Sequence, residues 1–386
     1  MTAMTHATVL GAGLVGSLIA RTLAADGWDV LVCDRAEEAL GALAGLPRVA
    51  TARLDFASGP SIAAAVAPAD VVVGAVPGFL GHAMLKTVIE ARKPVADISF
   101  APEDPLVLDS LAKAHGVPAI VDCGVSPGLS NLACGRAAAW FDTDSLDSIV
   151  ISVGGLPFTR TPPWEYRIVF SATDVIEEYT RPARLVEDGR VVTRPALSEA
   201  TPFEVPGVGT LEGFLTDGLR TVLTTVKARN LREQTLRWPG HAGKMRLLRD
   251  GGFFSDVPVE AGGVRVAPRA VAEALLFPMW KRPEGEEEFT VLRVESRGTR
   301  AGRPARLSHD LFDRTDLRTG ATSMARTTGF PCVLAARLLA SGTFREPGVF
   351  PLELLGSRPD LFSAFVDGLA AFGVAFSETE EDPWPR

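Results

Sequence analysis

The chain has 386 residues, of which 46% are hydrophobic and 22% charged, values that are typical of folded proteins and argue against a disordered or fibrous chain. This length predicts two domains of roughly 100–200 residues each. A net charge of −8 and short runs of like charge exclude the basic surface that nucleic-acid binding requires.

The cysteines and apolar runs limit the cellular setting. Four cysteines are scattered without a CxxC pair or a histidine cluster, so we expect neither a metal site nor a disulfide framework. No apolar run approaches the ~18–20 residues of a membrane span, and the first expected strand begins by Ala7. We therefore expect a cytoplasmic protein without a membrane partner.

The first third of the chain alternates short β-branched runs with helical segments. This pattern is typical of a parallel sheet that is covered on both faces. Gly27 is expected to end the first helix, and Asp104 and Gly116 bound a later one. The fold class predicted is α/β, with a Rossmann-type doubly wound sheet. Six strands are expected, in the segments ATVL, WDVLVCD, VATARLD, VVVGAVP, PVADIS and PAIVDCG.

A glycine cluster joins the first strand to the first helix. Gly11 permits a tight turn, Gly13 allows a pyrophosphate to approach the backbone, and Gly16 allows the helix to pack closely on the strand. The phosphates would bind the free N–H groups at the helix N-terminus, next to Leu14 and Val15. The alternative is a tight turn with no ligand, but the strand–glycine–helix context favours a dinucleotide.

The end of the second strand indicates which dinucleotide is bound. Asp34 lies eighteen residues after Gly16, where a carboxylate accepts hydrogen bonds from both ribose hydroxyls and repels a 2′-phosphate. This favours NAD over NADP. Arg35 favours NADP instead, because an arginine at this place accommodates the 2′-phosphate in some proteins.

The fourth expected strand also ends in a turn that contains glycine, in the segment VVVGAVPG. In the expected strand order this strand neighbours the first, so Gly74, Ala75, Val76 and Pro77 would line the cofactor site. The alternative is a simple strand-to-helix turn.

The sequence changes character after Asp122. Hairpins are expected in RLVEDGRVVTR, with an Asp188-Gly189 turn, and in FEVPGVGTLEGFL. Further antiparallel strands are predicted in the segments EFTVLRVESRG and RLSHDLFD. The helix that starts at Thr328 is apolar nearly all round, which predicts burial against the parallel sheet.

Several segments together resemble the saccharopine dehydrogenase-like family, and most closely its lysine 6-dehydrogenase branch. The resemblance implies a discontinuous cofactor domain, residues 1–123 and 320–386, and a substrate domain, residues 124–319, built on a mixed sheet. It also implies NAD-dependent oxidation of the terminal amine of a basic amino acid, with release of ammonia. The segments are GAVPGFLG, DCGVSPGLSN, VGGLP, IEEYTRPAR, DGLRT, TLRWPGHAGKM and TGFPCVLAARLL.

Two acidic residues are candidates for holding the substrate proton, because a lysine ammonium with a pKa of about 10.4 must become neutral before it loses hydride. Asp122 and Asp97 each end a predicted strand, where such sheets place their ligands. The alternatives are a helix cap for Asp122 and a structural role for Asp97. Ser99 would face the nicotinamide or lie in a solvated loop.

Basic residues are candidates for the substrate carboxylate, since a guanidinium matches it with two parallel hydrogen bonds. Arg237 in RWPGH is the first choice, and the resemblance implies the same role. Arg181 and Arg220 are second choices, and Lys244 is a further candidate. His241 would relay protons, or would only pack or cap a helix.

Three functions remain open at this point. The first is an NAD-dependent lysine 6-dehydrogenase, and the second is NADPH-dependent imine reduction of the saccharopine reductase or carboxynorspermidine dehydrogenase kind. The third is an NAD-binding sensor or scaffold without catalysis. A homodimer is also expected, formed through an edge or face of the second domain's open sheet.

Overall fold

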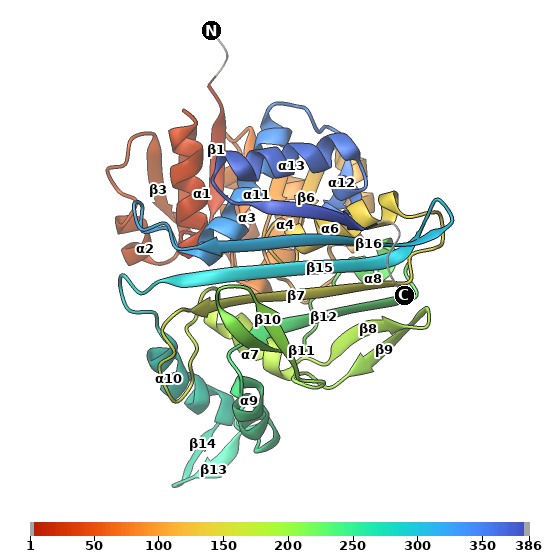
Figure 1. Cartoon of the computed structure of the whole chain (residues 1–386). Coiled ribbons are helices and arrows are strands. Elements are labelled where there is room, and N and C mark those ends of the chain that lie inside the picture. Colours follow the sequence, from red (N-terminus) through yellow and green to blue (C-terminus); the bar gives the residue numbers. More distant parts are fainter. Residues whose placement is uncertain (1–3, 382–386) are drawn as a thin grey trace. The chain divides into compact units, whose positions relative to one another are not determined.

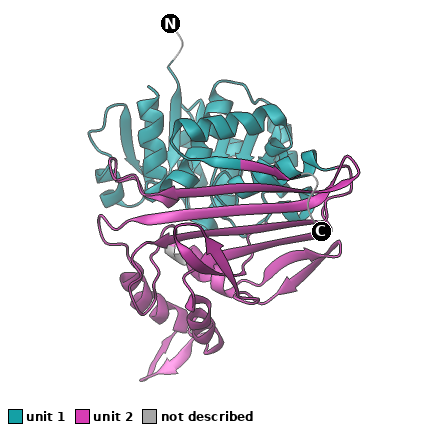
Figure 2. Ribbon diagram, viewed as in Figure 1, with its two compact units in different colours: residues 1–141, 220–226, 325–377 teal, residues 142–219, 227–324, 378–386 magenta. Residues whose placement is uncertain are grey.

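A computed structural model describes residues 4–381, and within it the chain divides into two compact units (Figure 2). Unit 1 comprises residues 1–141, 220–226 and 325–377, and unit 2 comprises residues 142–219, 227–324 and 378–386. Each unit is thus built from segments that are far apart in the sequence.

Unit 1 contains a seven-stranded parallel sheet in the order β17-β6-β5-β4-β1-β2-β3. The six predicted strands are all present, and their order confirms the doubly wound fold, because the strand order reverses between β1 and β4. β17 was not predicted and extends the sheet beside β6. The strands are β1 (His6–Leu10), β2 (Asp29–Asp34), β3 (Val49–Arg53), β4 (Val71–Gly74), β5 (Val95–Asp97), β6 (Pro118–Val121) and β17 (Gly348–Pro351).

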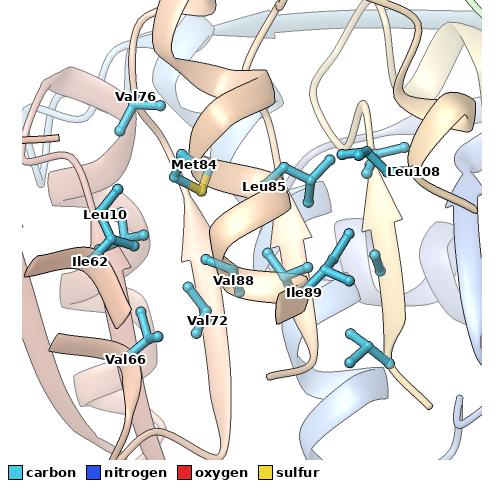
Figure 3. Packing of buried hydrophobic residues seen from close by; sticks show 14 of the residues in the cluster. Leu10, Ile62, Val66, Val72, Val76, Met84, Leu85, Val88, Ile89 and Leu108 are labelled. Atoms are coloured by element: carbon cyan, nitrogen blue, oxygen red, sulfur yellow. The ribbon is translucent and has the colours of Figure 1, made fainter. Parts of the chain in front are cut away.

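Helices of unit 1 bury apolar faces against this sheet. On α4, Met84, Leu85, Val88 and Ile89 recur at helical spacing and pack near Val72 of β4 (Figure 3). The helices are α1 (Leu14–Ala25), α2 (Glu37–Gly41), α3 (Gly59–Val66), α4 (Gly78–Glu90), α5 (Asp109–His115), α6 (Leu129–Trp140), α8 (Val222–Thr225), α11 (Ser323–Ala340), α12 (Leu352–Gly356) and α13 (Pro359–Ala371).

The predicted buried helix is α11, which begins five residues earlier than expected. Cys332 and Val333 are fully buried, and the Cys332 Sγ lies 3.8 Å from the Ala96 carbonyl oxygen of β5. Burial against the parallel sheet is therefore confirmed. Unit 1 also contains α6 and residues 220–226, which the sequence assigned to the second domain.

Unit 2 is built on a mixed sheet in which β10-β11-β12-β7-β15-β16-β18 are neighbours and β8 links β9 to β12 (Figure 1). β12 and β7 are parallel. The two expected hairpins, β8–β9 and β10–β11, are present, and the two further expected antiparallel strands, β15 and β16, pair with each other. The strands are β7 (Ser148–Pro157), β8 (Ala183–Glu187), β9 (Arg190–Arg194), β10 (Thr201–Val205), β11 (Gly209–Leu215), β12 (Asn230–Arg237), β15 (Glu288–Arg300), β16 (Arg303–Arg314) and β18 (Phe376–Glu381).

The remaining elements of unit 2 are three helices and a small hairpin. They are α7 (Ala172–Thr180), α9 (His241–Asp250), α10 (Pro268–Trp280), β13 (Val259–Ala261) and β14 (Val264–Val266). Across residues 4–381, no helix has both the length and the apolar character needed to cross a bilayer.

Helices α6 and α12 of unit 1 pack closely at Gly135, where no side chain fits between them. A Cβ added to Gly135 of α6 would lie 1.9 Å from the Glu353 carbonyl oxygen of α12. Gly135→Ala should therefore lower the free energy of unfolding by about 1–3 kcal/mol, measured by urea denaturation. Gly41→Ala in α2 is the control, because its Cβ would meet no atom within 4 Å. Equal urea midpoints for Gly135→Ala and wild type would contradict this packing.

Candidate functional site

The glycine loop of unit 1 has the geometry of a phosphate cradle. Gly11 has a φ of 116°, and a Cβ there would lie 2.2 Å from the Ala75 carbonyl oxygen. A Cβ on Gly16 would lie 2.1 Å from the Gly11 carbonyl oxygen. Gly13 differs, because its Cβ would meet no atom within 4 Å, and no side chain caps the start of α1 there. The first N–H groups of α1, from Leu14 and Val15 onward, therefore suit a pyrophosphate.

Asp34 ends β2 beside this loop. One carboxylate oxygen accepts a 2.7 Å hydrogen bond from the Ala12 N–H, and the other accepts a 2.8 Å bond from the Ala36 N–H. These bonds fix the carboxylate at the place where the ribose of a bound dinucleotide is expected. Arg35 is exposed next to it.

The end of β4 makes room for an acidic side chain. A Cβ on Gly74 would lie 2.2 Å from the Oδ1 atom of Asp97, so only glycine leaves space for this carboxylate. Val76 is buried, and Pro77 stands at the N-cap of α4. The strand end therefore has a packing role toward β5 in addition to the expected role toward the cofactor.

Asp97 is buried at the end of β5 and holds Ser99. Its Oδ1 atom accepts bonds from the Ser99 hydroxyl at 2.7 Å and from the Ser99 N–H at 3.1 Å. Burial raises the pKa of Asp97 to about 7, and the neighbouring Asp122 adds to this, against the lowering effect of Ser99 and Arg220. Asp97 therefore exchanges its proton near neutral pH.

Asp122 forms a buried ion pair with Arg220 inside unit 1. The Arg220 Nη2 atom donates to Oδ1 of Asp122 at 3.0 Å and Nε donates to Oδ2 at 3.3 Å, while Nη1 donates to the Ala101 carbonyl. Both side chains are nearly inaccessible. The guanidinium expected to bind substrate is thus engaged by the carboxylate expected to hold the proton.

Arg237 forms a second buried ion pair, within unit 2. Its Nη2 atom donates to Glu178 of α7 at 2.8 Å, its Nη1 atom donates to the Leu236 carbonyl at 3.0 Å, and the guanidinium lies 4.9 Å from the Tyr166 ring centre. Within the described residues, its buried Nε–H has no hydrogen-bond partner. Burial raises the pKa of Glu178, although the Arg237 charge opposes this.

His241 is a neutral hydrogen-bond partner in this structure. Its Nε2 atom lies 2.9 Å from the Tyr179 hydroxyl and its Nδ1 atom lies 3.1 Å from the Trp164 carbonyl. The carbonyl only accepts, so Nδ1 carries the hydrogen and Nε2 accepts from Tyr179. Burial, with the Arg237 charge, lowers the pKa of His241 to about 3. These contacts favour the packing alternative over proton relay.

The two remaining basic candidates have partners near the surface of unit 2. Arg181 lies 3.8 Å from Glu177, and Lys244 donates to the Pro163 carbonyl at 2.6 Å and lies 3.8 Å from Glu165. Neither is buried like Arg237. No group of histidine, cysteine or acidic residues in residues 4–381 has the arrangement of a metal site.

Glu233 is a residue that the sequence analysis missed. It is buried on β12 two residues before Thr235, and it accepts a 2.5 Å hydrogen bond from the Thr216 hydroxyl. Burial raises the pKa of Glu233 to about 8, and Glu178 and Asp217 add to the effect. The alternation of Glu233, Thr235 and Arg237 on one face of a strand was the signal available.

Comparison with known proteins assigns the chain to a family. The model described as the saccharopine dehydrogenase NADP binding domain matches residues 7–120, and the model described as the saccharopine dehydrogenase C-terminal domain matches residues 124–374. The chain belongs to the saccharopine dehydrogenase family. It is thus an oxidoreductase of that family with a nicotinamide cofactor, as the glycine loop predicted.

Relatives within the saccharopine dehydrogenase family are distant. An NADP-dependent, L-glutamate-forming saccharopine dehydrogenase of Pyricularia oryzae is 26% identical over 64% of this chain and 58% of its own. The carboxyaminopropylagmatine dehydrogenase of a Synechocystis species is 22% identical over 99% of both chains. The apo saccharopine dehydrogenase (L-Glu forming) of Saccharomyces cerevisiae has the same fold, with a TM-score of 0.80 at 20% identity, over 98% of this chain and 100% of that one.

The raised pKa of Asp97 generates a prediction about stability. Between about pH 4 and 7 the folded protein keeps a proton on Asp97 that the unfolded chain has lost, so raising the pH favours unfolding. Asp97→Asn should remove this contribution. Urea denaturation gives the free energy of unfolding of each protein at each pH. The value for wild type minus the value for the variant should fall as the pH rises from 4 to 7. The exposed Glu90→Gln is the control, and parallel pH curves for wild type and Asp97→Asn would refute the assignment.

Proposed function

We propose that this protein catalyses the NAD-dependent oxidative deamination of the terminal amine of a basic amino acid, with L-lysine as the best candidate substrate. Substrate ammonium, NAD⁺ and water give aldehyde, ammonium, NADH and a proton. With lysine the aldehyde is 2-aminoadipate 6-semialdehyde, which cyclises on its own α-amine to piperideine-6-carboxylate. The observation that carries the proposal is the pair of buried carboxylates, Asp97 and Asp122, at the ends of adjacent strands of the nucleotide-binding sheet.

Proton handling is the task we assign to these carboxylates. The nicotinamide, when bound, accepts a hydride from the carbon that carries the amine. The amine must be neutral at that moment, and Asp97, whose pKa is about 7, accepts a proton near neutral pH. Arg220 orients the Asp122 carboxylate through two hydrogen bonds, and we assign to Asp122 the task of attracting the substrate ammonium.

Substrate recognition is the task we assign to Arg237. Its guanidinium keeps its charge, because Glu178 stabilises it. Its buried Nε–H has no hydrogen-bond partner within residues 4–381 and is therefore available to a substrate carboxylate. The Tyr166 ring packs against the guanidinium, and His241 packs against the Tyr166 ring. An amino-acid substrate supplies the α-carboxylate that this group matches.

A second candidate function is reductive imine chemistry with NADPH. Its support is the NADP binding description of the matching family model and the full-length similarity to carboxyaminopropylagmatine dehydrogenase. Asp34 favours the first candidate, because its fixed carboxylate repels a 2′-phosphate. A sensor without catalysis would not need two buried carboxylates at the ends of adjacent strands of the nucleotide-binding sheet.

The cofactor preference is testable at Asp34. Wild-type protein should bind NAD at least about tenfold more tightly than NADP, since the carboxylate binds ribose hydroxyls and repels phosphate. Asp34→Asn should reduce that preference at least about tenfold, measured by calorimetry. Asp26→Asn, at the end of α1, is the control. Tighter binding of NADP by wild type would exclude NAD as the cofactor and favour the reductive function.

The products distinguish the two functions. L-Lysine with NAD at pH 9–10 should yield NADH and ammonia in equal amounts, because oxidation of a primary amine releases ammonia on hydrolysis. Arg237→Lys should raise the KM for lysine at least about tenfold, with an unchanged Kd for NADH. Secondary amines such as saccharopine are the comparison substrates. NADH formation from these alone, without ammonia, would contradict the proposal.

A further inference from the structure

Tyr166 is a buried tyrosine whose hydroxyl is unpaired. It is 1% exposed and belongs to the hydrophobic cluster that helices α7, α9 and α10 share in unit 2 (Figure 1). Within residues 4–381 its hydroxyl has no hydrogen-bond partner. A buried donor without a partner lowers stability, and nearly all such groups in folded proteins are bonded. A ligand that supplies the missing acceptor would explain why this hydroxyl is present.

The ring of Tyr166 has the packing contacts that are usual in a core. Its centre lies 5.4 Å from the Trp280 ring centre, with the two planes at 87°, and 5.2 Å from the His241 ring centre. The Arg237 guanidinium lies 4.9 Å from the same ring. These contacts involve the ring alone, so phenylalanine at this position would keep them. Packing therefore explains the aromatic ring but gives no reason for the hydroxyl.

The carboxylates near Tyr166 are bonded to other donors. Glu178 accepts a hydrogen bond from the Arg237 Nη2 atom at 2.8 Å. Glu288 accepts one from the Met324 N–H at 2.9 Å. Burial raises the pKa of Tyr166 well above its usual value, and the charges of these two carboxylates add to the effect, so the hydroxyl keeps its proton. The hydroxyl is thus a donor that lacks an acceptor.

Arg237 carries a second unpaired donor beside Tyr166. Its Nη1 and Nη2 atoms are bonded to the Leu236 carbonyl and to Glu178, whereas its buried Nε–H has no partner in the part of the chain that the structure describes. The guanidinium packs on the Tyr166 ring, so the two unpaired donors belong to side chains in contact. A carboxylate has two oxygens that only accept hydrogen bonds, and it matches such a pair with one oxygen for each donor.

We propose that the Tyr166 hydroxyl and the Arg237 Nε–H bind the two oxygens of one substrate carboxylate, which makes Tyr166 a specificity-determining residue. The inference rests on the proposed function in taking Arg237 as the group that recognises this carboxylate. It applies to both candidate reactions, because lysine and saccharopine each carry an amino-acid carboxylate. A ligand without a carboxylate leaves both buried donors unpaired, and sites of this kind reject such ligands strongly.

The stability of Tyr166→Phe without substrate tests whether the hydroxyl is unpaired in the free protein. The variant keeps the ring and removes a donor that has no acceptor, so its unfolding temperature should exceed that of wild type by at least about 2 °C in scanning calorimetry. Tyr179→Phe is the matched control, because the Tyr179 hydroxyl bonds His241 at 2.9 Å, and this variant should unfold at a lower temperature than wild type. A Tyr166→Phe protein no more stable than wild type would overturn the proposal.

Ligand binding tests what the hydroxyl recognises. Calorimetric titration of the NADH-bound protein with L-lysine should give a Kd at least about tenfold higher for Tyr166→Phe than for wild type. The diamine 1,5-diaminopentane lacks the carboxylate and should bind the two proteins equally. In turnover with NAD, the KM for lysine should rise while kcat changes less than about twofold, because the bond is the same in the ground state and the transition state. Equal Kd values for lysine, or an equal loss with the diamine, would overturn the proposal.

Saccharopine separates failure of this inference from failure of the proposed function. If lysine neither binds nor reacts while saccharopine binds, binding at least about tenfold weaker to Tyr166→Phe would support the carboxylate site and exclude lysine deamination. Equal binding of saccharopine to wild type and variant in that case would overturn the carboxylate site. A wild-type protein that binds neither amino acid would overturn both proposals.

Discussion

The close backbone approach between the glycine loop and the end of β4 is the constraint on which unit 1 depends. The carbonyl oxygen of Ala75 occupies the space that a side chain at Gly11 would need, and the carbonyl oxygen of Gly11 does the same at Gly16. These contacts bring β1, α1 and β4 together at the point where strand order reverses. The approach leaves the backbone around Gly13 uncovered by any side chain, and the helix N-terminus supplies the positive potential that phosphates require.

Each unit places an arginine–carboxylate pair at its candidate site, Asp122 with Arg220 in unit 1 and Glu178 with Arg237 in unit 2. Replacing a buried ion pair with apolar residues is often neutral or stabilising, so such pairs contribute little to stability by themselves. In the proposed reaction their value lies in chemistry: one pair fixes the Asp122 carboxylate at the end of β6, and the other presents a positive charge to the substrate. Under the same proposal Asp97, with its raised pKa, is the group that exchanges a proton near neutral pH.

Local patterns in the sequence were sufficient to predict the strands, the glycine loop and the hairpins. The Asp188-Gly189 turn has positive φ at both positions, which this pair of residues favours. Long-range partners could not be predicted, because no local pattern relates Asp122 to Arg220, which lies 98 residues away. For the same reason the sequence assigned residues 220–226 to the second domain, although Arg220 and the short helix α8 lie within unit 1. The sequence leaves both proton relay and packing open for His241, because the burial that lowers its pKa depends on residues far away in the chain.

Binding of a nicotinamide dinucleotide at the bare backbone of the glycine loop is the central claim, and calorimetric titration with NADH tests it most directly. Wild-type protein should bind one NADH per chain. Gly13→Val, whose side chain enters open space and would leave the folded structure intact, should bind at least about tenfold more weakly with an unchanged unfolding curve. Equal affinity of the two proteins for NADH would contradict this account.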